Sequence, residues 1–153
     1  MKRSVFGMLA IGAVLVSVSN VPLFGQAANE KSLYDRLGGK KAITAVVDEF
    51  VGRVARDTRI NAYFGAPASD PARLKTFKSN LVDQICQTSG GPCKYRGKDM
   101  KSAHVGMGVS GADFDALVQD LVDALDTCKV GQHEKDQLLG ALGPMKGDIV
   151  EKK

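Results

Sequence analysis

Apolar residues spaced three and four positions apart, in runs that glycines cut short, are the feature that most constrains the fold of this chain. The clearest run predicts one apolar face on a helix from about residue 41 to residue 56. It comprises Ala42, Ile43, Val46, Val47, Phe50 and Val54. Alternating strand patterns are scarce. The sequence therefore predicts an all-α protein with roughly six helices of unequal length.

Local start and stop signals place the other helices. Asp70 followed by Pro71 is a strong helix start, because aspartate caps the first turn and proline needs no partner there. The sequence from Ser110 to Asp113 resembles a capping box at the start of a long helix. The remaining expected segments are a short helix at 32–37, an apolar face at 74–85, about two turns at 98–104, and a last helix interrupted at Gly143-Pro144.

The first 27 residues are expected to be a cleavable signal peptide, leaving a domain at 28–153. Met1-Lys2-Arg3 is positive, residues 5–18 are apolar except for one serine, and Gly25-Gln26-Ala27 resembles a cleavage site. An uncleaved anchor is the alternative, although the run is shorter than the about 20 residues of a membrane span. We expect a periplasmic or secreted protein that has no membrane contact after cleavage.

Charge argues against a nucleic-acid partner. The formal net charge is +4, and removal of Lys2 and Arg3 leaves +2, because residues 1–27 contain no acidic residue. No basic stripe interleaved with aromatic residues is visible. The oligomeric state is left open.

Three cysteines in an expected exported protein raise the question of disulfides. Cys86 and Cys93 flank the turn Ser89-Gly90-Gly91-Pro92 and could pair if their Cα atoms come within about 7 Å. The alternative is a buried Cys86 beside an exposed Cys93. Cys128 is left over.

His104 is one of two histidines, and three interpretations are open for it. It is a surface histidine at a helix end, a catalytic base, or the single axial ligand of a haem. No serine or cysteine nucleophile stands in a recognisable motif around it. Spacing and composition alone favour the surface interpretation.

The order of several motifs resembles the truncated haemoglobins, most closely their group I branch. The resemblance covers residues 32–150. It rests on "LYDRLGG" at 33–39, "AVVDEFVGRVARDTRINAYF" at 45–64, "GGPCKYRGKDMKSAH" at 90–104, "FDALVQDLVDAL" at 114–125 and "LLGALGPMKGDIV" at 138–150. It implies a shortened globin fold, a two-over-two helical sandwich around haem b and its iron.

The resemblance also implies roles for individual residues. His104 matches the proximal iron ligand, and its Nδ1–H needs a partner, for which we expect a backbone carbonyl of the preceding turn. The other residues implied to contact haem are Phe64, Phe77, Leu81, Ile85, Tyr95, Met100, Phe114 and Leu117.

The distal side departs from the group I pattern, in which a tyrosine follows the helix phenylalanine and a glutamine lies on the next helix. Here Phe50 is followed by Val51, and the glutamine position falls on Leu81. Lys78, Asn80 and Gln84 are polar neighbours that could reach the ligand, and Asn80 and Gln84 complete the expected distal pocket. Val51 has no hydrogen-bond donor, so we expect oxygen to bind more loosely, since one such bond contributes about 1–3 kcal/mol.

The expected function is reversible binding of a diatomic gas, O2 or NO. One alternative is an enzyme, an NO dioxygenase or weak peroxidase. It would need an external electron donor, because the chain has no flavin or nicotinamide motif. The other is a haem redox or electron-transfer module.

Overall fold

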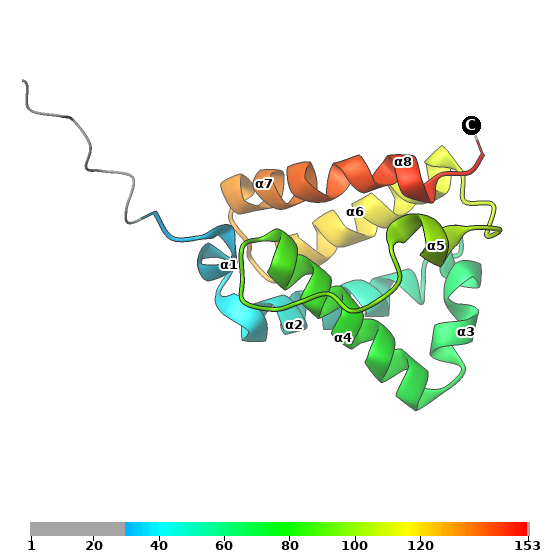
Figure 1. The fold of residues 1–153 in the computed structure, drawn as a ribbon, viewed down its shortest axis with the longest axis horizontal. Helices are drawn as coiled ribbons and strands as arrows, with labels where there is room; N and C mark the ends of the chain where they lie inside the picture. The colour runs from blue at the N-terminus through cyan, green and yellow to red at the C-terminus, as the bar shows by residue number, and fades with distance from the viewer. Residues whose placement is uncertain (1–29, 153) are drawn as a thin grey trace, which may run out of the picture.

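The computed structural model describes residues 30–152, and the expected signal peptide lies outside these residues. The described chain folds into helices joined by short turns (Figure 1). The longer helices are α2 (Gly39–Val54), α4 (Pro71–Thr88), α6 (Gly111–Thr127) and α7 (Gln132–Leu142). The shorter pieces are α1 (Leu33–Arg36), η1 (Asn61–Phe64), α3 (Gly65–Ala68), α5 (Met100–His104), η2 (Gly143–Met145) and α8 (Lys146–Ile149).

The four long helices lie in two layers, α2 with α4 and α6 with α7 (Figure 1). Helix α2 makes its most extensive contacts with α6 and α4, and α4 also contacts α7. Buried apolar side chains from all four helices form one main core that includes Val47, Ile85, Leu125 and Leu138. This is the expected all-α, two-over-two arrangement.

The predicted caps are present where two of the long helices begin. The Asp70 carboxylate accepts from Ala72 N–H, with Pro71 in the first turn of α4. Ser110 and Asp113 form the reciprocal capping box of α6. Gly38 has φ +94°, and a Cβ there would lie 2.9 Å from the Ala42 Cβ, so this position requires glycine. The first glycine motif therefore allows the sharp turn from α1 into α2.

The structure divides the expected elements more finely than periodicity does. The helix expected at 98–104 begins at Met100, because Asp99 is its N-cap. The last helix is interrupted at Gly143–Met145, where proline forces a 3-10 turn between α7 and α8. The tyrosine and phenylalanine of the 61–64 segment form a separate 3-10 turn. The core pattern and the short helices α1 and α5 were therefore predicted, whereas η1 and α3 were not.

A second, smaller apolar cluster lies at the C-terminal end of the fold. It consists of Val109, Phe114 and Ile149, with Met100 and Met145 packed against it. The chain end returns to this cluster, since Ser110 and Lys152 form an isolated parallel bridge. Among residues 30–152, no helix is both long enough and apolar enough to span a bilayer.

Candidate functional site

His104 is the last residue of α5, and its ring is fixed by its own helix. Nδ1 lies 2.7 Å from the carbonyl oxygen of Met100, one turn earlier. A carbonyl only accepts, so Nδ1 carries the proton and donates it. In the neutral imidazole the lone pair is therefore on Nε2, which is the state a metal ligand needs. The half-buried ring is thus held in one tautomer by the kind of partner the sequence predicted.

The glycine loop after His104 is closed by a residue far along the chain. The two carboxylate oxygens of Glu151 accept from Gly106 N–H at 2.7 Å and Gly108 N–H at 2.6 Å. Both glycines have positive φ, which turns their N–H groups toward one side. These backbone hydrogen bonds hold the pKa of Glu151 below its usual value. The C-terminal segment therefore fixes the loop that follows the histidine.

A pocket of about 390 Å³ lies between α2, η1, α3 and α4. Its walls are mostly apolar and include Phe50, Val51, Phe64 and Phe77, all four of which were expected near haem. The Phe64 and Phe77 rings are 5.8 Å apart between centroids and tilted by 60°. The structure thus brings together the expected distal residues of α2 with the first aromatic residue of α4.

An ion pair lies in the wall of this pocket. Nζ of Lys78 on α4 is 2.8 Å from Oδ1 of Asp48 on α2, and both residues line the cavity. Asn61 is the other polar residue of the lining. Val51 contributes only methyl groups. No hydroxyl group lines the cavity, and its one cationic side chain is engaged by a carboxylate.

Helix α4 connects this pocket with the histidine side. The Nε2 amide of Gln84 donates toward the sulfur of Met100 at 3.5 Å and toward that of Met145 at 3.2 Å. Met100 also supplies the carbonyl that holds His104. From Phe77 to Gln84 the helix rises about 10 Å. The pocket and the histidine helix therefore flank successive turns of one face of α4.

The remaining expected site residues do not line the pocket. Ile85 is buried in the main core, and Leu81 and Leu117 pack against that core while partly exposed. Phe114 belongs to the smaller cluster, with Nζ of Lys146 5.2 Å from its ring centroid. Asn80 is half-buried on α4. Gln84 directs its amide to the two methionine sulfurs.

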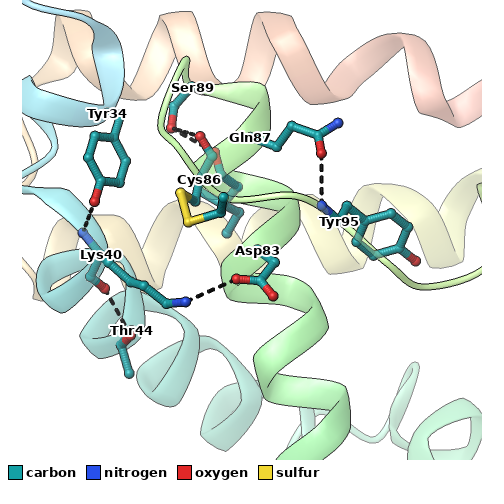
Figure 2. The surroundings of a disulfide bond; sticks show 10 residues. Tyr34, Lys40, Thr44, Asp83, Cys86, Gln87, Ser89 and Tyr95 are labelled. Atoms are coloured by element: carbon teal, nitrogen blue, oxygen red, sulfur yellow. Dashed lines mark hydrogen bonds and ion pairs between the residues drawn. A yellow bond between two sulfur atoms is a disulfide. The ribbon is translucent and has the colours of Figure 1, made fainter.

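The two expected disulfide partners are joined (Figure 2). Cys86 and Cys93 form a disulfide, with their Cα atoms 5.7 Å apart. Cys128 is the free cysteine of the described chain, and burial raises the pKa of its thiol. Tyr95 lies two residues beyond the disulfide, where its N–H donates to Oε1 of Gln87.

Sequence reasoning missed the partners that are distant along the chain. Glu151 is 45 residues from Gly106, and Met145 is 61 residues from Gln84. Neither stands in a motif with its partner, so no local pattern could have found them. Asp48 was missed because an exposed acidic residue on a helix is ordinary.

The residues present fit a large, flat and mostly apolar ligand held through one imidazole. The histidine is fixed through its Nδ1, and the half-buried Leu81 lies between Phe77 and Gln84 on α4. Val105, next to His104, is 70% exposed. Among residues 30–152, no three His, Cys, Asp or Glu side chains gather where they could hold a metal ion by themselves.

Comparison with known proteins agrees with this fit. The family model of the bacterial-like globins matches residues 32–151. The group 1 truncated hemoglobin GlbN of Mycolicibacterium paratuberculosis is 31% identical over 122 residues, which is 80% of this chain and 86% of that protein. The protein of the same name from a Nostoc species is 32% identical, over 79% of this chain and 98% of its own.

Solved structures show the same relationship. Truncated hemoglobin from Tetrahymena pyriformis in its Fe(III) form aligns with a TM-score of 0.72 at 26% identity, covering 80% of this chain and all of that one. The 2/2 hemoglobin of a Synechococcus species, solved in the cyanomet state with covalently attached heme, aligns with a TM-score of 0.71 at 28% identity and equal coverage. This chain belongs to the bacterial-like globins, within group I of the truncated haemoglobins.

Proposed function

We propose that this protein is a haem b globin that binds a diatomic gas, O2 or NO, at an iron with His104 as its one protein ligand. Bound haem iron would supply an open coordination position for the gas. The chain supplies the apolar surroundings, excludes water and fixes the imidazole. Reversible gas binding requires no catalytic residue from the chain.

One observation carries this proposal, the hydrogen bond from His104 Nδ1 to the Met100 carbonyl. A surface histidine gains little from a fixed tautomer, whereas a metal-bound imidazole gains basicity and orientation from it. A general base for covalent catalysis would need a side-chain nucleophile within hydrogen-bond reach. Among residues 30–152, the one hydrogen bond of the His104 ring is to the backbone carbonyl of Met100, and no nucleophilic side chain bonds to it.

Reconstitution of the purified protein with haem tests the proposal directly. We expect a Soret band at one haem per chain and its loss or strong shift in His104→Ala. His133→Ala is the matched control, because His133 lies on α7, in its first turn. A chain that takes up no haem, or a His104→Ala protein with an unchanged spectrum, would contradict the assignment.

The apolar pocket supports weak retention of O2. Val51 offers no donor, and the Lys78 ammonium is paired with Asp48 in the pocket wall. Without the hydrogen bond that a tyrosine at position 51 would donate, the gas loses about 1–3 kcal/mol of stabilisation. We therefore infer fast O2 release and poor discrimination against carbon monoxide, which suits gas exchange or NO chemistry better than storage.

An NO dioxygenase or weak peroxidase with an external electron donor is the second candidate, and one observation favours it. Lys94, Arg96 and Lys98 are exposed on the segment before α5, while the alternate residues Tyr95 and Gly97 are less exposed. None of these cations forms a salt bridge within residues 30–152. This cationic strap adjoins the histidine helix and would attract an acidic donor protein.

Stopped-flow mixing separates these two functions. One NO, one O2 and one electron give one nitrate, so turnover requires a reductant at each cycle. Nitrate beyond one equivalent in the presence of an acidic ferredoxin, decreasing with salt and in Lys94→Glu/Lys98→Glu, favours the enzyme. The control Lys41→Glu/Lys129→Glu makes the same charge change at exposed lysines outside residues 94–98. A single equivalent under all conditions favours gas binding alone.

A redox or electron-transfer role is the third candidate. A low-spin ferric protein without an exchangeable ligand position would favour it, and a ligand such as cyanide that binds readily would argue against it.

We also propose that residues 1–27 are removed on export to the periplasm or medium. N-terminal sequencing of the exported protein should begin near Ala28, and a start at Met1 would contradict cleavage.

A further inference from the structure

The segment between the distal helix α4 and the histidine helix α5 is attached to α4 by two neighbouring contacts. The disulfide joins Cys93 to Cys86, which is completely buried in the core. The Tyr95 N–H donates to Oε1 of Gln87 at 2.8 Å. Cys86 and Gln87 are consecutive on α4, so they hold positions 93 and 95 together (Figure 2).

Of these two contacts, the disulfide is the one strong enough to hold the segment without the other. Gln87 is exposed, and a solvent-exposed hydrogen bond competes with water at little net gain. The turn before Cys93 is fitted to the disulfide, because a Cβ at Gly91 would lie 2.7 Å from the Cys86 sulfur. The Gly91 N–H also donates to the Cys86 carbonyl at 2.8 Å. The chain reversal at the end of α4 is therefore built around the sulfur atoms.

A continuous series of short contacts runs from this anchor to the imidazole. The Tyr95 hydroxyl donates to the Lys98 carbonyl at 2.7 Å, and a side chain at Gly97 would collide with the Tyr95 ring. Asp99 then caps α5 by accepting from Ser102 N–H at 2.9 Å. Within α5, the Met100 carbonyl holds His104. Each contact spans at most four residues.

Helix α5 depends on such anchoring because it has only five residues. A helix of this length is not stable by itself in water. Its direction must come from its neighbours, namely Gln84 on α4, the α8 helix and the anchored segment before it. The anchored segment is the one of these neighbours that a disulfide fixes to α4.

We propose that the Cys86–Cys93 disulfide and Tyr95 form a positioning element that fixes the orientation of the His104 imidazole relative to α4. This inference rests on the proposed function, since it assigns the purpose of the anchor to haem ligation. A disulfide that served stability alone would strengthen the fold without changing the iron–histidine bond.

The test compares the holoprotein of Cys86→Ala/Cys93→Ser with that of the control Cys128→Ser. The iron–histidine stretching band of the ferrous protein should shift or broaden in the double variant and remain unchanged in the control. Haem loss to an acceptor globin should become roughly ten-fold faster, the factor expected if one residue must be ordered again. An unchanged band and unchanged haem loss, with only a lower melting temperature, would overturn the proposal.

Two further comparisons keep the test decisive if the double variant folds poorly. Tyr95→Phe keeps the ring but removes the hydroxyl that reaches Lys98, and it should shift the same band while the disulfide remains. In the haem-free protein, reduction with a dithiol should increase hydrogen exchange at residues 94–104 but not in α6, and reoxidation should reverse this. Equal exchange in both states would contradict the positioning role.

The two proposals fail in different ways. If His104→Ala keeps the haem spectrum of the native protein, the ligand assignment is wrong and the positioning proposal falls with it. If His104→Ala abolishes the spectrum but neither the disulfide nor the Tyr95 variant alters the band, the haem function remains and only the positioning proposal is rejected.

Discussion

Lys78 of α4 and Asp48 of α2 form an ion pair, with 2.8 Å between Nζ and Oδ1, in the wall of the pocket that contains Val51. The Lys78 side chain is 33% exposed and that of Asp48 55% exposed. Such a partly exposed pair contributes little stability, at most about 1 kcal/mol. The pair is therefore of more consequence for access to the pocket than for the stability of the fold.

Asp48→Asn should release Lys78 and open this wall of the pocket. We expect the association rate of carbon monoxide to rise several-fold, because the side chain no longer bridges the two helices, while the melting temperature changes little. Flash photolysis of the carbon monoxide complex measures the rate.

The chain offers a matched control for this change. Lys40 of α2 and Asp83 of α4 form a second pair between the same helices at 3.1 Å, and neither lines the pocket. Asp83→Asn should leave the association rate unchanged. If carbon monoxide associates equally fast with Asp48→Asn and Asp83→Asn, the Lys78–Asp48 pair does not control access to the pocket.

Val51→Tyr should restore the donor that the group I pattern places after the helix phenylalanine. A hydroxyl in the pocket should slow O2 release about ten- to a hundred-fold, the range given by 1–3 kcal/mol for a hydrogen bond to a polarised ligand. Val51→Phe fills a similar volume without a donor. If both variants slow release equally, steric closure rather than hydrogen bonding is responsible.

Glu151→Gln should weaken the closure of the loop after His104 in a pH-dependent way. Hydrogen bonds from Gly106 and Gly108 lower the pKa of Glu151 below 4.5 in the folded chain. Its contribution to stability is therefore complete above pH 4.5 and disappears as the pH falls through the lowered folded-state pKa.

Thermal unfolding of the native protein and of Glu151→Gln across this pH range checks the prediction. The native protein should be more stable at neutral pH, and the difference should vanish in acid. Asp148→Asn, in the neighbouring α8 helix, removes a carboxylate that forms no hydrogen bond or salt bridge in the described chain. A difference that persists in acid would indicate that shape, not charge, accounts for the effect.

The predictability of the site follows how far apart its parts lie along the chain. The helix α2 and the caps of α4 and α6 are local, so periodicity and spacing predict them, whereas the carbonyl partner of His104 was implied by the family resemblance. Cys86 and Cys93 are separated by a single turn of the chain, so their pairing could also be proposed from the sequence. The contacts of Glu151 with Gly106 and of Gln84 with Met145 depend on how the helices pack, which no local pattern encodes.

Asp120 shows the same limit within a helix. It lies on α6 next to the apolar Leu121, and polarity predicts a solvent-facing position. Instead it is only 7% exposed, and its Oδ2 is sealed from solvent with no hydrogen-bond partner among residues 30–152. Helix α6 packs on α2, and the charged groups that act on the pKa of Asp120 are Asp57, Arg59, Asp123 and Arg53.

Asp120→Asn should therefore stabilise the protein at neutral pH. Burial, with a smaller contribution from the Asp57 carboxylate, raises the pKa of Asp120 above 3.8. A carboxyl whose pKa is higher in the folded chain binds more protons there, so the native protein loses stability as the pH rises from 3.8 through the folded-state pKa. Asparagine avoids this loss.

Urea unfolding at pH 7 should give a larger free energy of unfolding for Asp120→Asn than for the native protein, and at pH 3 the gain should be smaller or absent. Asp123→Asn, whose side chain is 41% exposed, is the control and should show no comparable gain. A destabilised Asp120→Asn at both pH values would mean that the carboxylate has a favourable partner after all.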